Sequence, residues 1–509
     1  MPPRKRNSQR SPRILVVTPE ITYLPDGMGN MANSMTAKAG GLADVSSALV
    51  SSLLSLGADV HVALPHYRQM FHVDVGRLIS DELRIYQTKL PDDRVHLAED
   101  RAFYYRDTVY DDHSSENLRI ALAFQREVIN NIIPLVNPDL IHCNDWMTGL
   151  VPAAARRLNI PCLFTLHNIY TVKATLAEIE DRGIDAAQFW PYLYYAWPPG
   201  NYEETRATIP VDLLASGIFS SHFINTVSPT FLSEIVDGHH AFIPEHIRYE
   251  VAMKRNTGCA EGILNAPESA YNPTTDRALT YPYGPTTCVE GKRRNKREFQ
   301  KRTGLRPDPD APLFFWPSRL DPVQKGCQLL TEILFDLTST YANDNIQFAI
   351  VANGAFQRHF HEIVRYHDLF GRVAVCNFDE ALSHLGFAAA DFMLMPSRFE
   401  PCGLPQMIST IYGALPIVRA TGGLRDTVQH IDTSEETGNG FVFETYDSAG
   451  LWWAIKEAIH FHRLPPHIRA KHVARIMEQS AESFSHAVTA KHYFKIYERM
   501  LDRPLVSIF

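Results

Sequence analysis

The chain of 509 residues is long enough for about two to four domains of ordinary size. Its 49 Lys and Arg residues against 57 Asp and Glu residues leave a formal net charge of −8, which is not the basic balance typical of a nucleic-acid-binding protein. A hydrophobic content of 45% excludes a disordered chain, and no apolar run approaches the roughly 18 residues of a transmembrane helix. We therefore expect neither a nucleic-acid partner nor a membrane partner.

The seven cysteines are odd in number, far apart and without a CxxC pair. This spacing argues against a zinc cluster or a disulfide framework and fits a reducing compartment. The basic N-terminal segment 1–13 lacks the apolar stretch of a secretory signal, so we interpret it as a solvated tail, with an anionic-surface or targeting role as the alternative. A cytoplasmic protein is expected, and the oligomeric state stays open.

The first half of the chain alternates short apolar runs with amphipathic segments. An apolar run at 14–18 predicts a buried strand, and a polar loop follows it as far as residue 38. A helix is predicted to begin at the Gly40-Gly41 pair and to end at Gly57, ahead of a strand at 59–64. Further strands are predicted at 140–143, 162–166 and 223–227. This βαβ pattern indicates a parallel sheet.

Polar side chains follow these strands directly. Asp145 and Trp146 come after the strand at 140–143, and His167 and Asn168 come after the strand at 162–166. Because ligands bind at the carboxyl ends of strands in open α/β sheets, these residues are candidates for a binding site. The alternative is that they are ordinary polar loop residues.

Residues 265–312 show no clear period and predict a crossing between two domains, in which the basic cluster 292–297 forms a solvated helix face. A second alternating set follows, with strands predicted at 313–316, 347–351, 372–376, 392–395, 416–419 and 441–443. Helices are predicted at 325–341, around 452–459 and at 488–501. The pattern predicts an α/β protein with two doubly wound, Rossmann-like domains and a cleft between them.

Three loops of the chain carry residue types that suit the binding of an anion such as a phosphate. Glycine-rich turns at Gly40-Gly41 and Thr421-Gly422 open helices, where free backbone amides favour an anion. Arg319 and Lys325 flank another strand-to-helix turn and suit a diphosphate leaving group, with isolated surface charges as the alternative. No Walker motif and no convincing acidic pair is present, so neither a metal nor another cofactor is expected.

Glu400 lies in the segment 396–405, between a predicted strand and a helix. A carboxylate repels phosphate and is better suited to sugar hydroxyls, although capping of the following helix is the alternative. Gly403 permits close approach of the backbone to a ligand.

Eight segments occur in an order that resembles the bacterial glycogen synthase and plant starch synthase family. The two longest, PSRFEPCGL and YGALPIVRATGGLRDTV, are highly specific, and KAGGLADV is characteristic. The others are HCNDW, TLHN, TVSPT, GILN and SRLDPVQKG. The resemblance spans nearly the whole chain and implies the GT-B fold, two Rossmann-like domains. It also implies transfer of glucose from ADP-glucose to the non-reducing end of an α-1,4-glucan, with retention and without a metal.

The resemblance also implies roles for individual residues and domains. The implied catalytic residues are His167, Arg319, Lys325, Glu400 and Asp145, and the implied acceptor-binding residues are Asp145, Trp146 and Asn168. The nucleotide sugar is expected to contact Lys38, Gly40, Gly41, Arg319, Lys325, Glu400, Cys402, Gly403, Leu404, Thr421 and Gly422. The expected domains are an N-terminal starch synthase catalytic domain at 14–270 on the acceptor side, a nucleotide-sugar domain at 285–483, and a C-terminal helix at 484–509 that returns to the first domain.

The chain departs from the family pattern in ways that leave the donor base and the acceptor open. The loop at 19–38 is longer than usual, Asn144 stands where a second His is common, and 169–172 replaces a Tyr-Gln-Gly segment. The aromatic segment 189–197 is either a sugar-stacking platform or a core or subunit contact. The alternatives are a related transferase that uses UDP-glucose or a small-sugar acceptor, a phosphorylase of this fold, or a non-catalytic glucan-binding relative.

Overall fold

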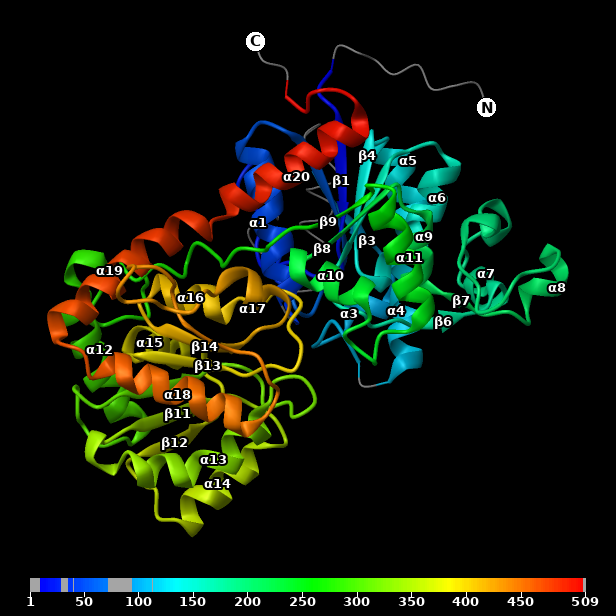
Figure 1. The fold of residues 1–509 in the computed structure, drawn as a ribbon. Helices are drawn as coiled ribbons and strands as arrows, with labels where there is room; N and C mark the ends of the chain where they lie inside the picture. The colour runs from blue at the N-terminus through cyan, green and yellow to red at the C-terminus, as the bar shows by residue number, and fades with distance from the viewer. Residues whose placement is uncertain (1–9, 29–34, 40, 72–93, 112, 507–509) are drawn as a thin grey trace. The chain divides into compact units, whose positions relative to one another are not determined.

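The computed structural model of the chain describes residues 10–28, 35–39, 41–71, 94–111 and 113–506 (Figure 1). The chain forms two compact units. Unit 1 comprises Met1–Val227, Leu232–Ile263 and His486–Phe509, and unit 2 comprises Ser228–Phe231 and Leu264–Ser485.

Unit 1 contains a seven-stranded parallel sheet, which confirms the sheet predicted for the first half. Its strand order is β3-β2-β1-β4-β5-β8-β9, so the chain winds outward in both directions from β1. The strands are β1 (Arg13–Val17), β2 (Asp59–Pro65), β3 (Val95–Ala98), β4 (Leu140–Asn144), β5 (Cys162–Leu166), β8 (Phe223–Thr226) and β9 (Ala260–Gly262). A separate pair of short antiparallel strands, β6 (Lys173–Ala174) and β7 (Val211–Asp212), lies beside it.

Unit 1 has eleven α-helices in its described residues, most of which lie on the faces of this sheet (Figure 1). They are α1 (Gly41–Ser55), α3 (Arg101–Tyr104), α4 (Ser114–Glu127), α5 (Ile133–Val136), α6 (Val151–Arg157), α7 (Leu176–Asp181), α8 (Tyr202–Arg206), α9 (Leu213–Ser220), α10 (Pro229–Asp237, whose first residues belong to unit 2), α11 (Glu245–Asn256) and α20 (His486–Leu501). One turn of π-helix, Val128–Ile132, joins α4 to α5. Helices α7 and α8 extend away from the sheet (Figure 1).

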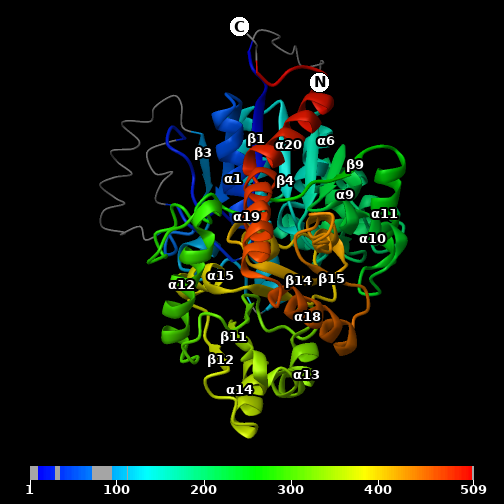
Figure 2. The same ribbon diagram turned by 60° about the vertical axis from the view of Figure 1, so that its left-hand side comes forward.

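The last helix, α20, packs on the first unit beside α1 (Figures 1 and 2). Its two buried tyrosines explain this placement. The hydroxyl of Tyr497 lies 2.7 Å from Nδ1 of His142 in β4, and the hydroxyl of Tyr493 accepts a hydrogen bond of 3.0 Å from Asn225 in β8. Burial lowers the pKa of His142 to about 3, so its ring is neutral and its two nitrogens bond to Tyr497 and to Thr165.

Unit 2 contains a six-stranded parallel sheet, as predicted for the second half. Its order is β12-β11-β10-β13-β14-β15, with strands β10 (Leu313–Trp316), β11 (Gln347–Val351), β12 (Val373–Cys376), β13 (Phe392–Met395), β14 (Leu415–Arg419) and β15 (Phe441–Phe443). Rings of Phe314, Phe348 and Phe392 stack on one face at centroid distances of 5.0 Å. The sheet therefore has an aromatic core on this side.

Helices lie on both faces of the second sheet (Figure 2). One face packs against α13 (Cys327–Thr340), α14 (Gln357–Tyr366) and α18 (Ser448–His462). The other packs against α12 (Cys288–Thr303), α15 (Glu380–Ala389), α16 (Pro405–Ile411) and α19 (Pro466–Ser483). The short helix α17 (Gly422–Thr427) follows β14.

The prediction that the basic cluster 292–297 is a solvated helix face is wrong for two of its five lysine and arginine positions. In α12 the side chains of Lys292 and Lys296 are buried, whereas Arg294 and Arg297 are exposed. The Lys292 ammonium donates to the carbonyls of Ala388 and Tyr412, and burial lowers its pKa to about 7. Lys296 pairs with Asp391 at 2.5 Å. These lysines join α12 to the sheet and its helices.

Other predicted segments are also revised. Arg13, assigned to the basic tail, is the first residue of β1, and its guanidinium pairs with the carboxylate of Asp59 at 3.1 Å. Residues 1–9 of the tail and residues 29–34 of the long loop lie outside the described part of the chain. In the aromatic segment 189–197, Phe189 and Tyr195 are buried and serve as core, whereas Trp197 is 54% exposed.

Candidate active site

Asp145 organises the loop ends that follow β4 and β5 in unit 1. One carboxylate oxygen accepts the backbone N–H of His167 at 2.8 Å, and the other accepts the side-chain amide of Asn168 at 3.0 Å. Asp145 has φ = 58°, an uncommon backbone conformation for a residue other than glycine. The structure thus brings Asp145, His167 and Asn168 together, three of the four residues predicted at this edge.

The imidazole of His167 is held in one orientation by a residue that the sequence analysis noted only as a departure. Its Nε2 lies 3.0 Å from the side-chain oxygen of Asn144, whose amide nitrogen donates to the carbonyl of Val17. Desolvation lowers the pKa of His167 to about 3, so the ring is neutral near pH 7. With Nε2–H donating to Asn144, Nδ1 keeps its lone pair as a hydrogen-bond acceptor.

Asp145 is 2% exposed, and this burial raises its pKa from 3.8 to about 7. Up to about pH 7 the folded protein keeps a proton on Asp145, whereas the unfolded chain loses this proton near pH 4. The carboxyl therefore makes the free energy of unfolding decrease as the pH rises from about 4 to 7. We expect the wild-type Tm to exceed the Asp145→Asn Tm by more at pH 5 than at pH 8, with the gap changing by about 2 to 4 °C.

Thermal unfolding of both proteins at the two pH values measures this gap. Asp181→Asn, at the exposed end of α7, is the surface control for the substitution of Asp by Asn. A gap for Asp145→Asn that does not change with pH would contradict the assignment of a raised pKa.

Trp146, predicted to bind the acceptor, is only 3% exposed. Its ring meets the edge of Tyr170 at a centroid distance of 5.5 Å, and Tyr170 is 47% exposed. The buried indole therefore packs under the side chain of Tyr170 in the loop that follows β5, and Tyr170 is the aromatic residue of this pair that solvent can reach. Sequence reasoning named Tyr170 only as part of a departure from the family pattern.

The glycine turn of unit 1 is built around two carboxylates. The ammonium of Lys38 pairs with Asp44 of α1 at 2.8 Å, and Gly41 begins that helix; Gly40 lies outside the described residues. The buried Glu20 accepts the backbone N–H of Ala39 at 2.9 Å and the hydroxyl of Tyr110 at 2.6 Å. Glu20 thus anchors the turn, a role that sequence analysis missed although Glu20 follows β1 directly.

In unit 2 the structure joins Lys325 to Glu400. The ammonium and the carboxylate are 2.6 Å apart, with side chains that are 11% and 8% exposed, and Ser397 donates a second hydrogen bond of 3.1 Å to the same oxygen. Glu400 is therefore paired with a cation and does not cap α16. The pair places one positive and one negative group at the carboxyl ends of β10 and β13.

The neighbours of this pair are positioned by backbone contacts. Cys402 is buried, and burial raises the pKa of its thiol to about 12, so it is a neutral wall of the site. Gly403 has φ = +73°, and Leu404 is half-buried just before α16. Arg319, just after β10, is exposed to solvent.

The glycines of α17 pack against the same loop. Thr421 is the residue before the helix, and the N–H of Gly423 donates to the carbonyl of Glu400 at 3.0 Å. A Cβ atom at Gly422 would lie 1.9 Å from that carbonyl oxygen, and one at Gly423 would lie 2.1 Å from the carbonyl oxygen of Cys402. Only glycine permits this approach, which aligns the first turn of α17 with the Lys325–Glu400 pair.

Two family models match the chain, one for each unit. The starch synthase catalytic domain matches residues 13–246, and glycosyl transferases group 1 matches residues 297–471. A glycogen synthase from Moorella thermoacetica is 32% identical over 98% of this chain and 98% of its own length. One from Exiguobacterium sibiricum is 34% identical over 90% of this chain and 95% of its own length.

The chain belongs to the glycogen synthase and starch synthase family. It is accordingly a glycosyltransferase. The catalytic domain of starch synthase IV from Arabidopsis thaliana, solved with ADP and acarbose, superposes with a TM-score of 0.76 at 25% identity, covering 97% of this chain and all of the other. Sucrose-phosphate synthase from Thermosynechococcus elongatus, at 18% identity and a TM-score of 0.58, shares the fold alone. These similarities confirm the GT-B fold.

The described residues form neither a metal cluster nor a membrane-spanning helix. No group of three or more His, Cys, Asp or Glu side chains there is arranged to hold a metal ion. Within the same residues, no helix has both the length and the apolar character needed to cross a membrane.

Proposed function

We propose that the protein transfers glucose from ADP-glucose to the non-reducing end of an α-1,4-glucan with retention of configuration. The observation that carries this proposal is the buried Lys325–Glu400 pair, packed beside the glycine turn that opens α17. A pair of this kind offers a cation to a departing phosphate and a carboxylate to sugar hydroxyls. The family membership and the starch synthase IV structure with ADP and acarbose support the same donor and acceptor classes.

Departure of the nucleotide diphosphate is the step that these cations serve. Negative charge grows on the diphosphate as the glycosidic bond to it breaks, and a preorganised ammonium in a desolvated site stabilises that charge. We assign Lys325 and Arg319 to the diphosphate, with Lys38, Gly41, Thr421 and Gly422 as further contacts. Glu400 orients the transferred glucose, together with the backbone around Cys402, Gly403 and Leu404.

We propose that the acceptor binds to the cluster at the carboxyl ends of β4 and β5. The loop carrying Asp145, His167 and Asn168 presents a neutral imidazole and an amide, which suit uncharged hydroxyls. Retention by a double displacement requires a carboxylate free to attack the sugar. Because Glu400 is engaged by Lys325 and Ser397, we favour attack from the leaving-group side, with the departing phosphate taking the acceptor's proton.

A comparison of donors tests the proposal. We expect incorporation of glucose into glycogen from ADP-glucose with kcat/KM at least tenfold higher than from UDP-glucose, measured with the same labelled glucose. Higher turnover with UDP-glucose would support the alternative donor. Transfer to a monosaccharide but not to glycogen would support a small-sugar synthase, and no turnover with either donor would contradict the proposed function.

We also expect the transfer reaction to proceed without a metal ion, because side-chain cations take its place. Activity should stay within about twofold after exhaustive treatment with EDTA, because Lys325, Arg319 and Lys38 supply the positive charge that Mg²⁺ supplies in metal-dependent transferases. The assay uses ADP-glucose and glycogen before and after chelation. A loss of activity that Mg²⁺ or Mn²⁺ restores would contradict metal-independent catalysis.

A further inference from the structure

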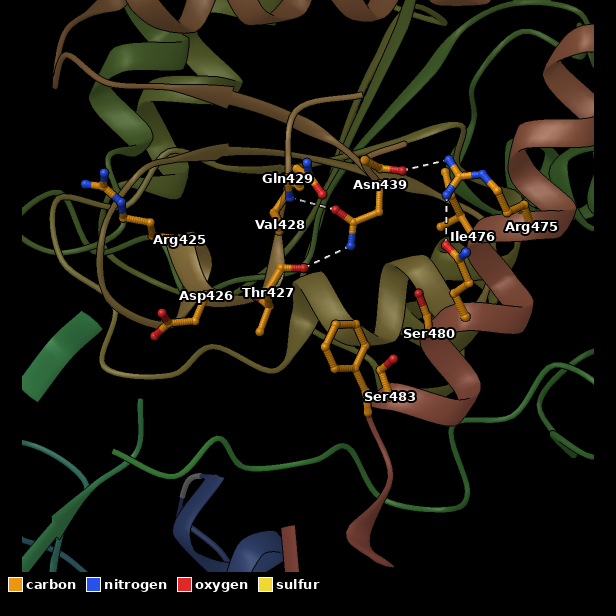
Figure 3. Close-up of a pocket in the computed structure, with 13 residues that line it drawn as sticks. Arg425, Asp426, Thr427, Val428, Gln429, Asn439, Arg475, Ile476, Ser480 and Ser483 are labelled. Atoms are coloured by element: carbon orange, nitrogen blue, oxygen red, sulfur yellow. Dashed lines mark hydrogen bonds between the residues drawn. The ribbon is translucent and has the colours of Figure 1, made fainter. Parts of the chain in front are cut away.

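A cavity of about 260 Å³ lies in unit 2, and neither Lys325 nor Glu400 is among the residues that line it (Figure 3). Its walls are the second half of α17, the turns at 428–429 and 438–439, and the last two turns of α19 with the residue that follows them. Ligand sites usually measure about 300 to 1,000 Å³, so this one suits a small ligand rather than a whole nucleotide sugar. None of its lining residues has a role in the proposed function.

The lining is rich in groups that both donate and accept hydrogen bonds. Gln479, Ser480 and Ser483 supply an amide and two hydroxyls, and the ring of Phe484 supplies an apolar surface. The side chain of Asn439 is held in the wall, because it accepts the N–H of Gln429 at 2.8 Å and donates to the carbonyl of Thr427 at 2.9 Å. Sugar hydroxyls likewise donate and accept, and the C–H face of a pyranose packs well on an aromatic ring. This composition favours a sugar over an apolar ligand.

The charges of the cavity do not form an anion site. The guanidinium of Arg475 is held against the wall by the side chain of Gln479 and the carbonyl of Gly438, both at 2.8 Å. Arg425 extends away from the other labelled residues in Figure 3. Asp426 adds a negative charge, although both its oxygens also accept hydrogen bonds from Thr230 at 2.6 and 2.9 Å. An uncharged sugar fits this balance better than a phosphate.

One helix connects the cavity to the donor loop. Thr427, a wall of the cavity, donates to the carbonyl of Gly423 at 2.6 Å and accepts a hydrogen bond from Gln406 at 3.1 Å. The same Gln406 amide donates to the carbonyl of Cys402 at 3.0 Å. The backbone N–H of Gly423 donates a hydrogen bond to the carbonyl of Glu400. The first turn of α17 therefore packs on the proposed donor site, while the second half of the same helix forms a wall of the cavity.

We propose that this cavity binds an uncharged mono- or disaccharide, and that the bound sugar raises the affinity of the protein for the ADP part of the donor by holding α17 in place. The choice of ADP rests on the proposed function, whereas the sugar site itself does not. Because binding free energies couple reciprocally, ADP must raise the affinity for the sugar by the same factor.

A local reporter separates this cavity from the acceptor site. Ile476 lines the cavity, so its ¹³C-labelled δ-methyl signal, identified with Ile476→Val, reports ligand entry there. We expect maltose to shift this signal saturably and to leave the signal of Ile363 in α14 unchanged. Ser483→Trp, at the exposed rim, should weaken the maltose effect at least tenfold, and Ser339→Trp on the exposed end of α13 should not.

Affinity for ADP, measured by calorimetry with and without saturating maltose, tests the coupling. We expect maltose to raise the affinity at least twofold in the wild type and in Ser339→Trp, and not in Ser483→Trp. An unchanged Ile476 signal in maltose overturns the sugar site, and so does a larger shift with inorganic phosphate than with maltose. An Ile476 shift with no effect on ADP overturns the coupling. None of these readouts requires turnover, so failure of the proposed transferase reaction would be recognised separately.

Discussion

Lys325→Ala is expected to lower kcat/KM for the nucleotide-sugar donor about 100-fold or more. Removal of one preorganised contact to the developing charge costs about 2.7 to 4 kcal/mol of transition-state stabilisation in comparable sites. The substitution also removes the ammonium that holds the buried Glu400 carboxylate at 2.6 Å, so the orientation of this carboxylate is lost as well. Steady-state rates with ADP-glucose and glycogen measure the effect.

The exposed Lys301 at the end of α12 supplies the control. Lys301→Ala should keep wild-type kinetics and the same Tm. The pair itself is tested by a double-mutant cycle, in which Glu400→Gln combined with Lys325→Ala should cost much less than the sum of the two single losses. Near-normal turnover of a folded Lys325→Ala protein, or additive losses, would remove the pair from the proposed mechanism.

Gly423→Ala is expected to reduce affinity for ADP and turnover at least about 30-fold. The added methyl group would lie 2.1 Å from the carbonyl oxygen of Cys402 and 2.6 Å from its carbonyl carbon and Cα. These are backbone atoms, so the helix start and the donor loop must separate. The separation breaks the Gly423–Glu400 hydrogen bond and moves the amides that we assign to the phosphates.

A matched control exists in the same unit. At Gly284 an added Cβ would meet only the Thr274 methyl carbon at 3.6 Å, an ordinary contact, so Gly284→Ala should bind ADP as the wild type does. The far-ultraviolet circular dichroism of both variants should match the wild type. If Gly423→Ala bound ADP within twofold of the wild-type affinity, the close packing of α17 would not be needed for donor binding.

Much of the fold was predictable because its elements have strong local signals. The run at 14–17 is uniformly apolar, and the 3.6-residue spacing of leucines and valines in 42–53 indicates one helical face ending at Gly57. The segments around Lys325, Glu400 and Gly422 were recognisable because each follows a buried strand, and parallel strands place such loops at one edge of a sheet.

The contacts that were not predicted join residues distant in sequence. Lys292 and Lys296 belong to a run of basic residues typical of a solvated face, yet their ammonium groups reach carbonyls and a carboxylate about 100 positions away. The anchoring of His167 by Asn144, and of the Lys38 turn by Glu20, likewise depends on which loops meet at the sheet edge. No local pattern specifies these partners.

The amino-acid composition excluded a disordered chain, and no apolar run is long enough to span a membrane. The net charge of −8 argued against a nucleic-acid partner without indicating a ligand. The sequence by itself determined the two parallel sheets and the family, and it supplied the charged and glycine residues that we propose bind a nucleotide sugar. Only the tertiary structure decided that Lys325 is buried against Glu400, that Asp145 is desolvated, and that the second half of α17 lines a polar cavity. Desolvation and close packing are properties of surfaces brought together by folding, so they cannot be assigned from residue types alone.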